Sequence, residues 1–257
     1  TNANTQVCII DSGYASGHPD LPSANVAGHD DPNGAGSWDT DENGHGTHVA
    51  GTVAAIGNAE GVIGVLPGVG VGAGASLYIV KVFGADGWTY SSSLVDALNQ
   101  CTGNPYRGNR NLVVSMSLGG SLKSRFEDSA FASAYNTGKV LPVAAAGNDG
   151  NSRNSYPASY SSVISVAAID ASKQWASFSQ YNSQVELAAP GVSVLSTVPE
   201  GTGSNTAVTV TNLTPNPEAD AMDGSPSTAA NGVTGALVDC GFGTSTCSGA
   251  SGRVCLI

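Results

Sequence analysis

The chain has 257 residues, and its 9 Lys and Arg against 20 Asp and Glu give a formal net charge of −11. This excess of acidic residues argues against nucleic acid or an anionic membrane surface as a partner, and no apolar run is long enough to span a bilayer. The length fits one large α/β domain, or one domain and part of another.

Short apolar runs recur along the first two thirds of the chain and are predicted to be strands covered on both faces, as in a parallel sheet. They occupy residues 7–10, 77–83, 112–116, 140–144 and 163–167. Between them, residues 92–101 and 125–136 repeat apolar side chains at helical spacing, and a run of small residues after Gly44 indicates a further helix. This alternation predicts an α/β fold, a three-layer doubly wound and mostly parallel sheet.

The composition changes after Pro199. Residues 200–232 are rich in Gly, Ser, Thr, Asn and Pro, whereas residues 235–240 and 254–257 are typical of new strands. We therefore expect one domain over residues 1–199, followed over residues 200–257 by a linker and the start of a small β-rich module.

Five cysteines suggest disulfides in an oxidising compartment. Cys8 lies in the first predicted strand and Cys101 at the end of a predicted helix, and neighbouring β/α units can bring such positions together. We predict a Cys8–Cys101 bridge and a small loop closed by Cys240 and Cys247. Cys255 would then pair beyond residue 257. The alternative is that these are buried free thiols.

Three positions suggest acid–base chemistry. Asp11 ends the first strand, and His45 stands at the mouth of the small-residue helix between Gly44 and Gly46. Strand ends in a parallel sheet open onto its functional edge, and a Gly-Asn turn at Asn148 follows a later strand. An acid, a base and an oxyanion donor at that edge would suit nucleophilic catalysis.

Three of these stretches resemble known active-site signatures. Asp11-Ser12-Gly13, the run over residues 45–51 and Ala145-Ala146-Gly147-Asn148 are similar to three of the four signatures of the subtilisin-like serine peptidases (subtilases). The similarity extends from Val7 to about Val198. It implies that Asp11 orients His45 as general base and that the Asn148 side chain donates to the oxyanion. His48, one helical turn after His45, corresponds to a packing residue in this pattern.

The fourth signature, a Gly-Thr-Ser-Met-Ala turn that carries the serine, is not recognisable. Gly243-Thr244-Ser245 contains part of it, but Thr246-Cys247-Ser248 follows, which indicates a loop rather than a helix. We expect the nucleophile beyond residue 257, so that the chain is an incomplete catalytic domain without its leading segment and serine helix. Residues 235–240 and 254–257 resemble the opening of the protease-associated domain that some secreted bacterial subtilases insert at this point.

The resemblance also implies a substrate groove. Ser117, Leu118 and Gly119 would pair with the peptide backbone, and Ala145, Ala146 and Gly147 would line the floor of a roomy first pocket. The opposite edge would be formed by Gly87, Trp88 and Thr89, in a loop one residue shorter than in common subtilisins.

Calcium is the cofactor that the resemblance implies, because hard cations take carboxylate, amide and backbone oxygens. Residues 56–62 resemble the high-affinity calcium loop of subtilases. The expected ligands are carboxylate, amide and carbonyl oxygens of Asp20, Ile56, Asn58, Glu60 and Val62.

The sequence thus predicts a secreted, extracellular serine endopeptidase that acts as a monomer on peptide or protein substrates. Its serine would come from the remainder of the same protein. The alternative is a peptide-binding subtilase homologue, or an inactive fragment, without a nucleophile.

Overall fold

A computed structural model describes residues 4–30, 34–58, 61–69, 74–85, 91–202, 237–239 and 254–256. The chain divides into two compact units, Thr1–Thr202 and Gly203–Ile257.

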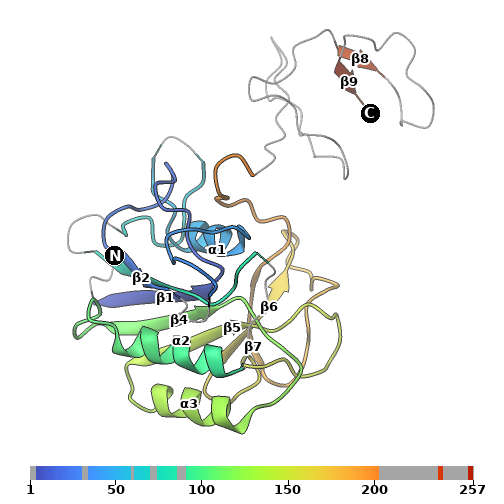
Figure 1. Ribbon diagram of the computed structural model, residues 1–257. Coiled ribbons are helices and arrows are strands. Elements are labelled where there is room, and N and C mark those ends of the chain that lie inside the picture. Colours follow the sequence, from blue (N-terminus) through green and yellow to red (C-terminus); the bar gives the residue numbers. More distant parts are fainter. Residues whose placement is uncertain are drawn as a thin grey trace. The chain divides into compact units, whose positions relative to one another are not determined.

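A seven-stranded sheet forms the middle of the first unit (Figure 1). All its pairings are parallel, in the order β2-β3-β1-β4-β5-β6-β7. The strands are β1 Thr5–Asp11, β2 Val26–His29, β3 Ser76–Lys81, β4 Asn111–Met116, β5 Val140–Ala145, β6 Ile164–Ile169 and β7 Val185–Pro190. Because β1 lies between β3 and β4, its last residue, Asp11, has a neighbouring strand on each side at the carboxyl ends of the strands.

Helices cover both faces of the sheet, as the α/β alternation predicts (Figure 1). Helix α1 (His45–Ala54) packs on one face, whereas α2 (Ser91–Gly103) and α3 (Arg125–Tyr135) pack on the other. β1 and β3 are buried along almost their whole length because both of their faces are covered. The predicted doubly wound fold is confirmed.

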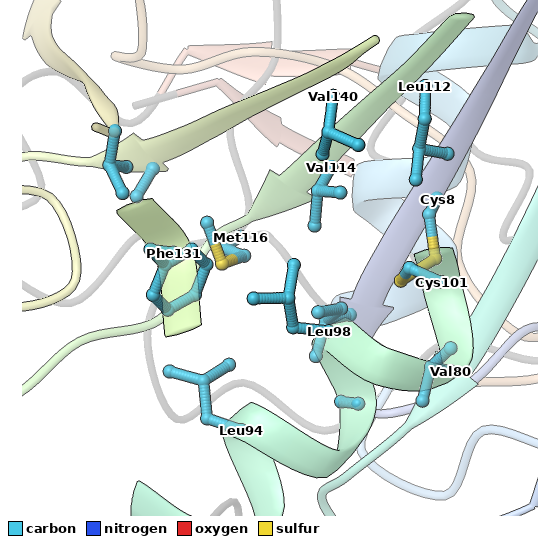
Figure 2. Close-up of a cluster of buried hydrophobic side chains, with 14 of the residues drawn as sticks. Cys8, Val80, Leu94, Leu98, Cys101, Leu112, Val114, Met116, Phe131 and Val140 are labelled. Carbon is cyan, nitrogen blue, oxygen red and sulfur yellow. A yellow bond between two sulfur atoms is a disulfide. The ribbon is translucent and has the colours of Figure 1, made fainter. Parts of the chain in front are cut away.

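The larger core cluster lies between the sheet and helices α2 and α3 (Figure 2). Leu94 and Leu98 of α2 point into it, as their helical spacing predicts. The predicted Cys8–Cys101 disulfide lies in the same cluster, with a Cα–Cα distance of 5.8 Å, and it joins β1 to α2. Both cysteines are fully buried.

Two strands escaped the sequence analysis, and both lie at edges of the sheet. β2 is half-buried throughout, and β7 is mostly exposed. Neither therefore needs the continuous apolar run by which the interior strands are recognised.

The second unit contains a short parallel pair, β8 (Leu237–Asp239) and β9 (Val254–Leu256), within the two strands expected there. Cys240, Cys247 and the side chain of Cys255 lie outside the described residues, as does Ser245. In the described part of the chain, no helix has the length and apolar character needed to cross a membrane.

Candidate active site

Asp11 lies at the carboxyl end of β1, where parallel strands present side chains to the edge of the sheet. Its carboxylate is fully buried. Asp11 Oδ1 accepts hydrogen bonds from the Ser12 backbone N–H at 2.8 Å and from His45 Nδ1, with a separation of 2.7 Å. The acid and base expected from the sequence are therefore in direct contact, which leaves His45 Nε2 free of the carboxylate.

Glycine lets the helix that carries His45 approach the strand that carries Asp11. A Cβ on Gly46, the second residue of α1, would lie 2.3 Å from the backbone oxygen of Gly13. Gly44, just before the helix, has φ of 87°, in the left-handed region that other residues rarely adopt. These two glycines allow α1 to begin directly above the end of β1.

Asp41 holds the start of α1, a role that the sequence analysis missed. One of its oxygens accepts from Ser12 Oγ at 2.8 Å and from the Gly44 N–H at 2.9 Å. The other accepts from the N–H and the hydroxyl of Thr47, at 2.8 and 2.6 Å. Aspartate is a preferred capping residue at helix N-termini, and its position shortly before Gly44 was the available signal.

Ser12, the residue after Asp11, links the end of β1 to the start of α1. Ser12 Oγ donates to Asp41 and accepts from the Gly46 N–H at 2.8 Å. The loop after β1 and the first turn of α1 are thus joined through one buried carboxylate and one hydroxyl, which holds the backbone positions of Asp11 and His45 relative to each other.

A segment from the end of the first unit packs against α1 and forms hydrogen bonds with it. The hydroxyls of Ser196 and Thr197 donate to the carbonyl oxygens of His48 and Thr47, at 2.6 and 2.8 Å. A Cβ on Gly51 would lie 2.2 Å from Thr197 Oγ1, so a glycine is needed here for the segment to lie against α1.

The pKa of His45 is raised above its ordinary value. The main cause is the hydrogen bond to Asp11, and the negative charges of Asp11 and Asp41 add to it, against partial burial, which lowers the pKa. The imidazole remains 51% exposed. Such a group can take up a proton on its exposed side while the carboxylate stabilises the resulting charge.

A cavity of about 860 Å³ opens beside the pair. Asp11 and His45 lie in its wall together with Ser117, Leu118 and Gly119, three residues expected to bind substrate. Those three follow β4, which neighbours β1. The structure therefore places these five predicted site residues along one cavity.

The other residues predicted to bind substrate or the oxyanion either lie at the same edge of the sheet or fall outside the described residues. Ala145 ends β5, and Ala146 and Gly147 form the turn that leads to the exposed Asn148. These four are not among the described residues that line the cavity. Gly87, Trp88 and Thr89 lie outside the described residues.

The expected calcium ligands come from two segments, Asp20 between β1 and β2 and residues 56–62 between α1 and β3. Asp20 is 2% exposed, and its Oδ2 accepts from the Val62 N–H at 2.8 Å. Its Oδ1 is buried and, among the described residues, has no hydrogen-bond partner. The Ile56 N–H donates to the Asp20 carbonyl at 3.0 Å, and the Asn58 amide to the neighbouring Pro19 carbonyl at 3.4 Å.

A buried carboxylate oxygen without a partner among the described residues, on a residue that hydrogen-bonds to Ile56 and Val62, has the donor chemistry that calcium takes. The residues present therefore fit this ion. Glu60 lies outside the described residues.

Comparison with known proteins gives one consistent picture. Residues 2–239 match the model of the Subtilase family. Subtilisin DY from Bacillus licheniformis is 46% identical over 204 residues, covering 78% of this chain and 69% of that protein. Subtilisin BL from Lederbergia lenta is 42% identical over 203 residues, with coverage of 79% and 69%.

A solved structure is similar as well. It is the psychrophilic subtilisin-like protease Apa1 from the Antarctic psychrotroph Pseudoalteromonas sp. AS-11, which is 52% identical with a TM-score of 0.69. The match covers 77% of this chain and 43% of that one.

Proposed function

This chain belongs to the subtilase family of serine-type endopeptidases, and we propose that it carries the acid, the base and an oxyanion donor of a secreted enzyme that hydrolyses peptide bonds with an Asp-His-Ser triad. The observation that carries the proposal is the 2.7 Å contact between Asp11 Oδ1 and His45 Nδ1 at the wall of a cavity.

The geometry supports a specific division of labour. Asp11 fixes the imidazole in the tautomer that has its proton on Nδ1, so that Nε2 accepts the proton of the serine hydroxyl as it attacks the scissile carbonyl. The raised pKa of His45 reflects how strongly Asp11 favours the imidazolium that this step creates. His45 then gives the proton to the leaving amine.

Asn148 is proposed as a donor to the oxyanion. It follows the end of β5, and Asp11 ends β1, two positions away in the same parallel sheet, so that both lie at the same edge. Removal of such a donor from a subtilisin lowers turnover by about 10²–10³, a known value for that family rather than one obtained from this structure. Asn148→Ala should act in the same way on kcat and much less on substrate binding.

The nucleophile is proposed to come from a segment beyond residue 257. In the sequence, Ser245 lies between Cys240 and Cys247 and is not followed by a helical pattern. A serine that starts a helix is activated by the N-terminus of that helix, and the sequence after Ser245 has no helical pattern.

A substrate peptide would bind as an added strand along Ser117, Leu118 and Gly119. Gly87, Trp88 and Thr89 would form the opposite edge, and Ala145, Ala146 and Gly147 would form the floor beside the scissile bond. The protein would act as a secreted monomer on peptides or proteins. Calcium bound by Asp20, Ile56, Asn58, Glu60 and Val62 would stabilise the loop that holds it.

A serine-reactive fluorophosphonate probe tests the proposal on the full-length protein. Peptide mapping should locate the label on a Gly-Thr-Ser sequence after residue 257, and the His45→Ala variant should lose the label because the hydroxyl is no longer deprotonated. Labelling of Ser245 would refute the position of the nucleophile. If the folded protein takes no label but still binds peptides, it is the non-catalytic homologue instead.

A further inference from the structure

A buried carboxylate lies in the wall of the same cavity as His45. Glu127 is in the first turn of α3 and is only 5% exposed, yet it lines the cavity together with Leu118 and Tyr156. It plays no part in the catalytic scheme above. A carboxylate is an unusual residue to bury in this position, because a charge removed from water is unfavourable unless it is paired.

Hydroxyls from two other segments fix the position of this carboxylate, and the N-cap of its own helix holds its backbone. The Ser91 hydroxyl, at the start of α2, donates to Glu127 Oε1, and the Tyr160 phenol donates to Glu127 Oε2 at 2.7 Å. The Glu127 N–H is capped by Ser124 Oγ at 3.3 Å. The pKa of Tyr160 is raised, first by burial and also by its bond to Glu127, so that the phenol keeps the proton it donates.

Both donors are neutral hydroxyls. Among the residues that the structure describes, no Lys, Arg or His lies within salt-bridge distance of Glu127. The nearby Lys123 pairs with Asp128 at 3.0 Å, and its ammonium lies 5.9 Å from the centre of the Tyr160 ring. A carboxylate can accept about four hydrogen bonds, so Glu127 retains acceptor capacity, and no described residue supplies a cation to it.

The wall beside Glu127 suits the rest of a long basic side chain. Leu118 and Leu122 line the same cavity as Glu127, and Leu122 is 86% exposed. The methylene groups of lysine and arginine pack along apolar surface of this kind while the charged end reaches a polar partner.

We propose that Glu127 makes this cavity selective for a peptide that places a lysine or arginine side chain at the Ser91–Glu127–Tyr160 cluster, away from His45. This inference rests on the proposed function, because it assumes that a peptide lies along Ser117–Gly119. It adds that the bound peptide is basic at one position.

The test uses the full-length protein in a His45→Ala background, so that peptides are bound and not cleaved. Binding of fluorescent peptides is followed by anisotropy. A neutral apolar peptide is compared with peptides in which a single lysine, or norleucine as its uncharged analogue, is moved through successive positions. At one position lysine should bind about 10- to 100-fold more tightly than norleucine, as expected for a charge-assisted hydrogen bond.

Two variants assign that advantage to Glu127. Glu127→Gln keeps the size and one acceptor oxygen for a hydroxyl but removes the charge, and it should abolish the lysine advantage while the neutral peptide binds as before. Asp96→Asn, on the exposed side of α2 and outside the cavity lining, makes the same change in net charge and should keep the advantage. Glu127→Asp serves as a second variant if Glu127→Gln does not fold, and its shorter side chain should reduce the advantage.

Binding of the neutral peptide without any lysine preference overturns this inference and leaves the proposed function intact. A lysine preference that persists in Glu127→Gln, or that Asp96→Asn also removes, overturns it as well. If no peptide binds to the folded protein, both proposals fail together.

Discussion

Removal of the Cys8–Cys101 disulfide by a double alanine substitution should strongly destabilise the first unit. The two cysteines are 93 residues apart in the sequence, and both are fully buried. In the loop-entropy description, a cross-link that closes a loop of this length stabilises the fold by about 4.6 kcal/mol. For a unit of about 200 residues, this corresponds to a fall in Tm of roughly 9–18 °C.

Guanidinium unfolding measures this effect directly. All three tryptophans, Trp38, Trp88 and Trp175, lie in the first unit, so their fluorescence follows that unit alone. With a slope of about 5 kcal/mol per M, the midpoint should fall by about 1 M. Coincident transitions by fluorescence and circular dichroism would show that one cooperative step is being measured.

Reduction supplies the matched control. Dithiothreitol should lower the midpoint of the native protein to near that of Cys8→Ala/Cys101→Ala and should leave the variant unchanged. The pKa of His45 should be the same in the folded forms, because the bridge does not contact the imidazole. A midpoint shift below about 0.2 M with an unchanged slope would refute the reasoning, since it would mean that the cross-link does not restrict the unfolded chain.

Three further predictions concern the site. Asp11→Asn should lower the pKa of His45, measured by NMR of the imidazole nitrogens. Because the pKa of His45 is raised in the folded chain, the stabilisation by the Asp11–His45 pair is fully present below about pH 6.5, the ordinary imidazole pKa. This stabilisation is lost as the pH rises through the folded-state pKa. An Asp11→Asn variant whose stability depends on pH in the same way as that of the native protein would contradict the assignment. Gly46→Ala should destabilise the first unit by about 1–3 kcal/mol in guanidinium unfolding and lower the pKa of His45, because its Cβ would lie 2.3 Å from the Gly13 oxygen; native stability would show that the close approach is not needed. Calcium at 100 times its Kd should stabilise the native chain by about 2.7 kcal/mol in calorimetry and Asp20→Asn much less, whereas equal responses would place the ion elsewhere.

The interior strands could be predicted from the sequence because each contains a short apolar run, and β1 and β3 are also buried on both faces. The helices between strands repeat apolar residues at helical spacing. β2 and β7 lie at the edges, where partial exposure permits mixed composition. Their pairing depends on neighbours that are distant in the sequence, so local pattern does not identify them.

The contact between Asp11 and His45 could be predicted because their neighbours are unusual in the sequence as well as in space. The glycines around His45 allow α1 to approach the end of β1 closely, and Asp11 is the carboxylate at that strand end. Both features can be recognised in the sequence. Glu127 has no comparable signal in the sequence, and Asp41 has only its position shortly before Gly44. Each is an ordinary acidic residue until the fold buries it among donors from other elements.

The interior position of β1 in the sheet has a consequence for the order of events during synthesis. The strand that ends in Asp11 gains its first neighbour only when residue 81 exists and its second only at residue 116. Contacts between such distant segments form slowly, because a long loop must close first. A nascent chain released before that point would have made both the carboxylate and the imidazole, yet it would lack the flanking strand that completes the sheet around the acid.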